Sequence, residues 1–236
     1  MRVLVLVIAS RGKAYDGMRR AWDVHLRAAP ACVDVRFLYG ARDDGAGDDG
    51  AGDDGLVGNV EYDIPECIVP GALDKTVRFL SETDVSGYAY VVRTNLSSWF
   101  HWDRLLAWLR ERPRAGFAAG YSPDRSHLSG CNLTLSRDLA AGLACAPLDR
   151  GLVDDLAWSP WIFSEAAVVE CVPRLDLVYG DYDVELHGNV DAAWHVRLKH
   201  TDRDLDVALM DFLAREYDPD QSVSAHAVAA LRAVTR

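Results

Sequence analysis

One stretch, from Tyr88 to Leu109, constrains the fold most, because its character changes twice within a short span. Residues 88–92 are mostly aromatic or β-branched and contain no proline, which predicts a buried strand. Residues 94–98 are small and polar apart from Leu96, and apolar side chains recur at helical spacing from Trp99 to Leu109. In open α/β sheets a polar loop between a strand and a helix lies at the carboxyl edge, where ligands bind. The alternative is an ordinary turn between a strand and a helix.

Segments of strand and helix character alternate along the chain. Strands are predicted at 1–9, 33–39, 60–64, 88–92, 115–120, 129–136 and 166–172, with an extended segment at 194–200. Helices are predicted from an N-cap at Asp16, at 73–80, 99–109, 136–143 and 151–158, from a capping box at Thr201 to Glu216, and at 222–234. This order predicts an α/β three-layer sandwich with a mostly parallel central sheet. Half of the 236 residues are hydrophobic, which is enough for a single domain over 1–236.

The acidic charge is concentrated in one segment. Residues 43–55 repeat a five-residue Asp/Gly unit and contribute six Asp to a net charge of -11. The segment has no apolar residue larger than Ala, so we expect a disordered surface insertion. Its spacing does not match an EF-hand loop, although Asp clusters can bind calcium. A chain with this charge is not expected to carry a wide basic surface for nucleic acid.

The spacing of the cysteines and the N-terminal sequence indicate the cellular compartment of the protein. The five cysteines are widely spaced and form no C-x-x-C motif, which indicates reduced, mostly buried thiols in an intracellular protein. The apolar segment 1–9 is short and lacks a cleavage signal, so we interpret it as a buried strand and not as a signal peptide. No segment reaches the roughly 20 apolar residues of a membrane span. We therefore expect a cytoplasmic protein.

Two further segments carry polar groups suited to anions. The first strand ends at Ala9, Ser10 and Arg11, without the glycine spacing of a P-loop or a dinucleotide-binding fingerprint. His195, Arg197 and Lys199 alternate in the extended segment, so their side chains point the same way and could grip a diphosphate. The alternative for the second segment is an edge strand that carries protective charges.

An acidic pair begins the helix predicted at 151–158. Asp154 and Asp155 are the best candidates for acid–base chemistry, although acidic residues also favour a helix start through the helix dipole. Trp158 and Trp161 follow closely. Aromatic faces stack on sugar rings, so these two residues are acceptor-site candidates, with core packing as the alternative.

Four blocks in order give the chain a resemblance to a known family. The blocks are Val5-Leu-Val-Ile-Ala-Ser10 with Met18-Arg-Arg-Ala-Trp22; Lys75-Thr76 before Tyr90-Val-Val-Arg-Thr-Asn-Leu-Ser-Ser98; Ser129-Gly-Cys-Asn-Leu-Thr-Leu-Ser-Arg-Asp138; and Asp154-Asp155-Leu156. Over roughly residues 1–160 the chain resembles glycosyltransferases of the GT-A fold. It is similar in layout to the β-1,3-galactosyltransferase-like family and to its shorter relatives in large DNA viruses and microbes.

The resemblance implies a nucleotide-sugar donor, with a UDP-sugar as first candidate, and a glycan or glycoconjugate acceptor. It implies that Asp155 is the base of an inverting transfer, supported by Asp154. Donor-binding residues under this resemblance are Ala9, Ser10, Arg11, Lys75, Arg93, Thr94, Asn95, Ser97, Gly130, Asn132, His195, Arg197 and Lys199. The acceptor residues are Trp158 and Trp161.

The chain departs from the family at the metal motif. The family ends its central strand in Asp-x-Asp, which holds Mn²⁺ or Mg²⁺, whereas this chain has Asn95 and Ser97 at those positions. Neutral oxygens bind these ions poorly compared with carboxylates, so no metal is assigned; the ligands of one, if present, would be Asn95, Ser97 and His195. Either fixed cations neutralise the diphosphate, or the domain binds a carbohydrate or nucleotide without transferring it. We take a nucleotide-sugar-dependent glycosyltransferase as the first expectation and the inactive binding domain as the second.

Overall fold

The fold was analysed in a computed structural model that describes residues 1–41, 58–122, 124–177, 184–187, 193–198 and 203–234. The Asp/Gly-rich segment 43–55 lies outside these residues, as does Lys199. Within the described ranges no helix is long and apolar enough to cross a membrane.

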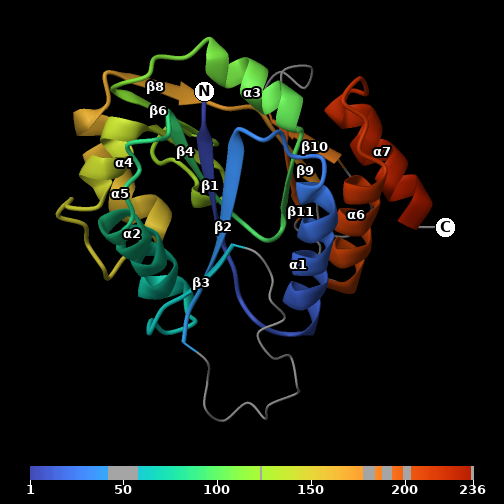
Figure 1. The fold of residues 1–236 in the computed structure, drawn as a ribbon, viewed down its shortest axis with the longest axis horizontal. Helices are drawn as coiled ribbons and strands as arrows, with labels where there is room; N and C mark the ends of the chain where they lie inside the picture. The colour runs from blue at the N-terminus through green and yellow to red at the C-terminus, as the bar shows by residue number, and fades with distance from the viewer. Residues whose placement is uncertain (42–57, 123, 178–183, 188–192, 199–202, 235–236) are drawn as a thin grey trace.

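A seven-stranded sheet forms the centre of the molecule (Figure 1). Its strands are β1 (Val3–Ile8), β2 (Val33–Tyr39), β3 (Asn59–Glu61), β4 (Tyr90–Asn95), β6 (Phe117–Gly120), β7 (Leu133–Ser136) and β8 (Val168–Cys171). They lie in the order β3-β2-β1-β4-β7-β6-β8. Every pairing is parallel except those of β7 with β4 and β6. The prediction of an α/β domain with a mostly parallel central sheet is therefore confirmed.

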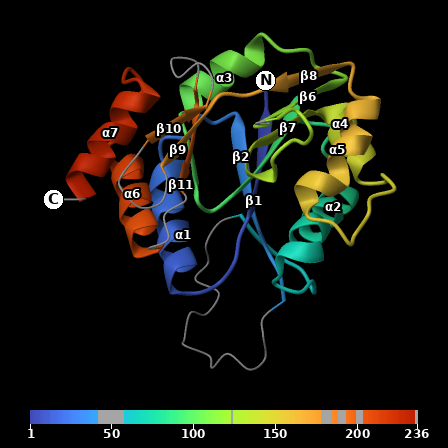
Figure 2. The same cartoon turned by 180° about the vertical axis from the view of Figure 1, so that it is seen from behind.

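Helices cover both faces of this sheet (Figures 1 and 2). The first face carries α1 (Lys13–Leu26), α3 (Trp102–Arg110), α6 (Arg203–Arg215) and α7 (Val223–Val234), and the second carries α2 (Leu73–Glu82), α4 (Arg137–Leu143) and α5 (Asp154–Glu165). Two apolar clusters result because β1 alternates Val3, Val5 and Val7 toward the first face with Leu4 and Leu6 toward the second. Together these layers form a single domain.

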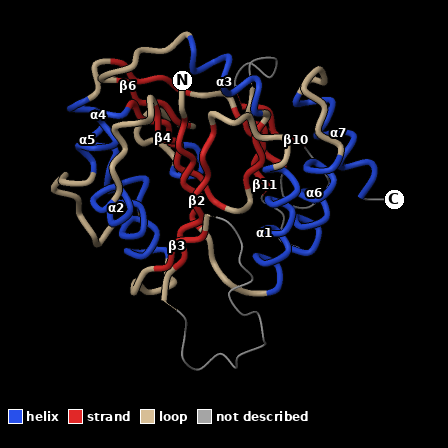
Figure 3. The backbone as a smooth tube through the Cα atoms, in the orientation of Figure 1, coloured by secondary structure: helices blue, strands red, loops and turns tan. Residues whose placement is uncertain are grey.

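A second sheet lies beside the first face, as the tube view in Figure 3 shows. It contains β10 (Val184–His187), β9 (Arg174–Leu177), β11 (His195–Leu198) and β5 (Ser98–Phe100), in the order β10-β9-β11-β5. Val196 and Leu198 of β11 join the apolar cluster on the first face. Because side chains alternate along a strand, Arg197 lies on the opposite side of this sheet from Val196.

The structure corrects several boundaries expected from the sequence. Trp99 lies in β5 and not in the following helix, because residues 98–100 pair with β11. Helix α1 begins at Lys13, directly after Gly12 at φ 118°, so Asp16 lies in its first turn and is not its N-cap. Strands β9 and β10 were not predicted. Of the segments expected at the C-terminus, α7 agrees closely with 222–234.

The cysteine prediction is only partly correct. All five cysteines are free thiols, as expected from their spacing. However, Cys67, Cys145 and Cys171 are exposed, Cys32 is half-buried and only Cys131 is buried, so the expectation of mostly buried thiols is wrong. Cysteine spacing reports whether thiols can pair, but exposure depends on where each segment packs.

Candidate functional site

The order of the strands locates a topological switch point between β1 and β4. From β1 the chain adds β2 and then β3 on one side, and afterwards crosses to β4 on the other side of β1. Ile8 at the end of β1 is in register with Asn95 at the end of β4. The segments Ala9–Arg11 and Asn95–Ser97 therefore lie at the same carboxyl edge, at the point where open α/β sheets bind ligands.

Arg197 contacts both polar residues at the end of β4. Strand β11 pairs antiparallel with β5, which brings Arg197 opposite Ser98. From this position its Nη1 donates to Asn95 Oδ1 and to Ser97 Oγ. Burial lowers the pKa of Arg197, but a guanidinium keeps its proton in proteins. Both of these hydrogen-bond acceptors are neutral, and the nearby negative charge comes from Asp176, which is opposite Arg197 on the neighbouring strand β9 (Arg174–Leu177).

The predicted line of three cations is not what the structure contains. His195 is fully buried, and burial together with Arg174 and Arg197 holds its pKa well below the ordinary value, so its ring is neutral at pH 7. Neither ring nitrogen has a hydrogen-bond partner among the described residues. Lys199 lies outside the described residues. Of the three, Arg197 is the cation that the structure places at the strand end.

A second buried arginine supports this region. Arg174 of β9 forms a two-point ion pair with Asp176, and its Nη1 lies 2.8 Å from the sulfur of Cys131. Asp176 is in register with Arg197 on the neighbouring strand. The side chains of Arg174, Asp176 and Arg197 therefore line one polar face of the second sheet, directed toward the turn that contains Cys131.

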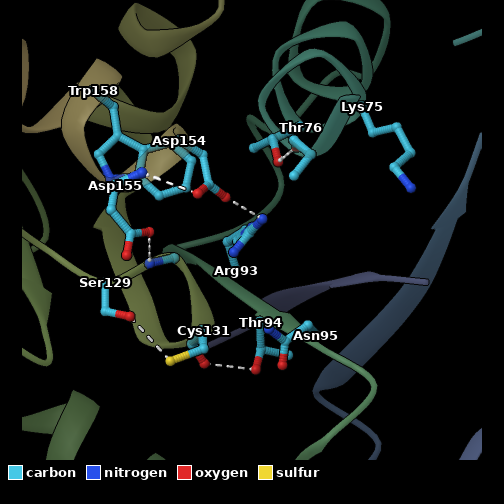
Figure 4. A network of polar contacts seen from close by, with 12 residues as sticks. Lys75, Thr76, Arg93, Thr94, Asn95, Ser129, Cys131, Asp154, Asp155 and Trp158 are labelled. Atoms are coloured by element: carbon cyan, nitrogen blue, oxygen red, sulfur yellow. Dashed lines mark hydrogen bonds and ion pairs between the residues drawn. The ribbon is translucent and has the colours of Figure 1, made fainter. Parts of the chain in front are cut away.

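The acidic pair is held beside the central strand by two different partners. Asp154, at the start of α5, accepts from Arg93 Nη2 of β4 at 2.5 Å, and this pair is buried. Asp155 accepts from the backbone N–H of Gly130, also at 2.5 Å. Figure 4 shows the Asp154 carboxylate directed toward Arg93 and the Asp155 carboxylate directed toward the backbone of the turn at Gly130. Arg93, a predicted donor-binding residue, is thus engaged by Asp154 and lies over the Trp158 ring at 5.3 Å.

The two carboxylates have different electrostatic environments. Burial, with a contribution from the neighbouring Asp154 charge, raises the pKa of Asp155 to about 6. Asp154 has the Arg93 guanidinium as its direct counter-ion. A half-buried carboxylate with a pKa near neutrality can exchange protons at physiological pH, which is the property that a general base requires.

A short 3-10 turn, η2 (Gly130–Asn132), joins the acidic pair to the arginine region. Gly130 donates to Asp155, the carbonyl of Cys131 accepts from Thr94 Oγ1 at 2.8 Å, and the Cys131 sulfur contacts Arg174. Through three contacts made by Gly130 and Cys131, the turn therefore connects α5, β4 and β9. Asn132 is fully buried, and neither its amide nitrogen nor its amide oxygen has a partner in the described ranges.

The other predicted donor-binding residues form a separate set of contacts at the carboxyl end of β1. Lys75 Nζ donates to the carbonyl of Ala9 and to Glu66, both at 3.0 Å, and Ser10 Oγ donates to the same carboxylate at 3.2 Å. Arg11 forms an ion pair with Glu61. Lys75 is buried, which lowers its pKa, so it stabilises the strand end through Glu66 and is not a free cation.

Glu66 is the organising residue that sequence reasoning missed. Besides Lys75 and Ser10, it accepts from the backbone N–H of Gly40, just after β2, at 2.5 Å. It lies in an irregular proline-flanked segment with no helical or strand periodicity, and an isolated Glu in such a segment gives no signal in the sequence.

Trp158 does not provide the acceptor platform expected from the sequence. Trp158 is fully buried, and its indole N–H donates to the carbonyl of Leu128 at 3.0 Å. It has no exposed ring face for a sugar, so the expectation for Trp158 is corrected to core packing. Trp161 is half-buried and packs toward α4, where its ring faces Gly142.

The site groups contact one another closely, and two cavities of the molecule lie away from them. One of about 310 Å³ is at the amino edge of the sheet, lined by residues that include Arg2, Tyr88 and Arg137, and it contains no predicted site residue. Among the described residues, no group of three or more His, Cys, Asp or Glu side chains is arranged to hold a metal. No protein-family model matches the chain, and a search of curated proteins found no match.

Proposed function

We propose that the protein is a nucleotide-sugar-dependent glycosyltransferase of GT-A type that binds the donor diphosphate with a fixed arginine. The observation that carries this proposal is the contact of Arg197 with both Asn95 and Ser97 at the switch point. These are the two positions at which the resembled family has its metal-binding carboxylates. A positive charge from the protein thus occupies the place where that family uses an ion.

The donor set at this edge does not fit a divalent metal. Asn95 and Ser97 offer neutral oxygens, and both already accept hydrogen bonds from Arg197. His195 lies on β11, the strand that also carries Arg197, so a metal bound to it would have to share the site with the guanidinium, which repels cations. We therefore assign no step to Mn²⁺ or Mg²⁺.

In the proposed reaction Arg197 stabilises the leaving group. As the bond between the anomeric carbon and the diphosphate oxygen breaks, its electron pair goes to that oxygen and negative charge develops there. A planar guanidinium with several donors can bind such a group through two hydrogen bonds. To bind it, Arg197 exchanges its contacts with Asn95 and Ser97 for contacts with phosphate oxygens.

Asp155 supplies the base. Its carboxylate removes the proton of an acceptor hydroxyl, whose oxygen then forms a bond to the anomeric carbon from the side opposite the diphosphate. Because the pKa of Asp155 is about 6, the basic form predominates at neutral pH. The rate should therefore rise as pH increases through about 6. Arg93 and the Gly130 N–H position the acidic pair without entering the reaction.

The second candidate is an inactive domain that binds a nucleotide or carbohydrate. The observation in its favour is the same pair of neutral residues, since Asn95 and Ser97 remove the family's metal site. If this alternative is correct, the protein binds UDP but does not consume any UDP-sugar. Measuring UDP release from a panel of UDP-sugars separates the two functions.

The proposal is tested by calorimetric titration of UDP in EDTA and in excess Mn²⁺. We expect similar affinities in both, and an affinity at least about tenfold lower for Arg197→Ala, because one charged hydrogen bond contributes about 1.5–3 kcal/mol. Asn95→Asp should also weaken binding, since the new carboxylate would pair with Arg197 and neutralise it. Arg232→Ala, an exposed arginine on α7, is the control and should bind normally.

The opposite results would identify a metal site. A hundredfold gain in affinity with Mn²⁺, or an Asn95→Asp variant that binds more tightly only when Mn²⁺ is present, would contradict the arginine-based proposal.

A further inference from the structure

Aliphatic side chains are exposed next to the acidic pair. Ile68 and Val69 are 73% and 37% exposed, and Leu152 and Leu156 are 40% and 47% exposed. We call these four residues the apolar rim. Exposed aliphatic residues scattered singly are ordinary, but a set of four beside a candidate base calls for an explanation.

The rim consists of two segments that lie side by side. Ile68 and Val69 are in η1 (Ile68–Ala72), which leads into α2, while Leu152 and Leu156 flank the start of α5. Helices α2 and α5 are neighbours on the same face of the sheet in both cartoon views (Figures 1 and 2), and η1 contacts α5. An ion pair between Asp74 of α2 and Arg150 joins the two segments.

Two rim residues flank the acidic pair in the sequence. Leu156 directly follows Asp155, and Leu152 precedes Asp154 by two residues. The arginine Arg197, proposed to hold the diphosphate, lies beyond η2 on the second sheet. Exposed aliphatic residues thus accompany Asp155 at the start of α5, whereas the cationic residue lies on the other side of η2.

The type of side chain indicates the type of acceptor. Sugars stack on aromatic faces, but Trp158 is fully buried and the exposed residues beside Asp155 are aliphatic. Aliphatic surface gains free energy by removing apolar groups from water and gains nothing comparable from hydroxyl-covered sugars. We propose that the acceptor is a hydroxyl group carried on an apolar skeleton, and not a hydroxyl of a saccharide. This proposal rests on the proposed function, because it assigns the acceptor of the same site.

The test uses 4-methylumbelliferone, a planar apolar molecule with one hydroxyl, and methyl β-D-glucopyranoside as the polar probe. Binding of each to the full chain is measured by calorimetry, with and without UDP. We expect 4-methylumbelliferone to bind and the glucoside not to bind. The double variant Ile68→Gln/Leu156→Gln should bind 4-methylumbelliferone at least about tenfold more weakly, because two apolar contacts are lost.

Phe163→Gln is the matched control. Phe163 is 38% exposed and lies in the same helix α5, at the end away from Asp155. This variant should bind 4-methylumbelliferone within about twofold of the unchanged protein. All variants should keep their affinity for UDP, which also shows that they are folded.

Several outcomes would overturn the proposal. The proposal fails if the glucoside binds more tightly than 4-methylumbelliferone, or if 4-methylumbelliferone does not bind. It also fails if the rim substitutions leave the affinity for 4-methylumbelliferone unchanged. Rim-dependent flotation with phosphatidylcholine vesicles would make the rim a membrane contact, and rim-dependent dimerisation in ultracentrifugation would make it an interface between two copies. If UDP fails to bind while rim-dependent binding of 4-methylumbelliferone persists, the proposed function fails but the apolar site stands.

Discussion

At the scale of single residues, adjacent carboxylates acquire different properties from their partners. Asp154 forms an ion pair with the Arg93 guanidinium. Asp155 instead accepts a hydrogen bond from one backbone N–H and is repelled by the negative charge of Asp154. The neighbouring positive charge of Arg93 lowers the pKa of Asp155 less than burial and Asp154 raise it. Two identical side chains at consecutive positions therefore differ in their surroundings: Asp154 is ion-paired with Arg93, whereas the pKa of Asp155 is raised.

The raised pKa of Asp155 makes a prediction about stability. Folding raises its pKa from 3.8 to about 6, so the folded state binds the proton more tightly than the unfolded state does. The resulting stabilisation is complete below about pH 4 and is lost as pH rises through about 6. Asp155→Asn carries no charge and should exceed the unchanged protein in free energy of unfolding by about 1–3 kcal/mol at pH 7. Near pH 4 the two should be similar.

Urea denaturation at several pH values between 4 and 7 measures this difference. The same variant should lose transfer activity by about 10²–10⁴-fold if Asp155 is the base. An Asn variant that is less stable than the unchanged protein at pH 7 would show that the charged carboxylate is favourable in the fold.

At the scale of elements, the η2 turn is the part that brings separate strands and helices to one place. It has only three residues, yet it contacts β4 through Thr94, β9 through Arg174 and α5 through Asp155. Such close approach requires a residue without a side chain. A Cβ added to Gly130 would lie 2.2 Å from Arg93 Nη1 and 2.9 Å from carboxylate oxygens of both Asp154 and Asp155.

Gly130→Ala should therefore separate the acidic pair from the turn. We expect a loss of about 1–3 kcal/mol in the free energy of unfolding, because an added methyl overpacks a buried, ion-paired cluster. Gly87→Ala is the control, since its nearest neighbour is the flexible tip of Arg2 at 3.5 Å, and it should change stability by less than about 0.5 kcal/mol. Chemical denaturation of both variants tests this. Equal stability of the two would mean that Arg93 moves aside without cost.

At the scale of the whole molecule, the acidic charge is separable from the fold. The six Asp of segment 43–55 provide more than half of the net charge of -11. Strands β2 and β3, between which this segment lies in the sequence, are paired in parallel through residues 37–39 and 59–61. The pairing itself uses no residue of the insertion.

Deletion of residues 43–54 should leave the fold intact. Because β2 and β3 are parallel, the shortened connection has to return from Tyr39 to Asn59, which lies opposite Phe37. One strand spacing and two residues of strand make this step about 8 Å, and residues 40–42 and 55–58 can reach more than about 20 Å. The net charge would change from -11 to -5 through the loss of six Asp. We expect the thermal midpoint and the UDP affinity to remain close to those of the full chain. A loss of several kcal/mol of stability would show that the segment is structural.

The sequence by itself determined the elements whose signals are local. Strand β1 follows from a short unbroken apolar run, and helices α2 and α7 follow from apolar residues at helical spacing. The acidic pair was placed at a helix start by its position before an apolar run. The polar residues after the central strand were predicted to lie at the carboxyl edge, and Asn95 and Ser97 do lie there. These features depend on neighbours within a few residues, which is what a sequence pattern records.

Only the tertiary structure decided which of these elements meet. Arg197 is 102 residues from Asn95 in the sequence, and no periodicity indicates that β11 pairs with β5. The same holds for Glu66, which joins three segments, and for Trp158, whose ring could have faced solvent or core with the same helical pattern. A periodic pattern fixes the apolar side of an element, but the partner of each polar group is set by the packing of the whole chain, because contacts between distant segments form only when all of them are in place.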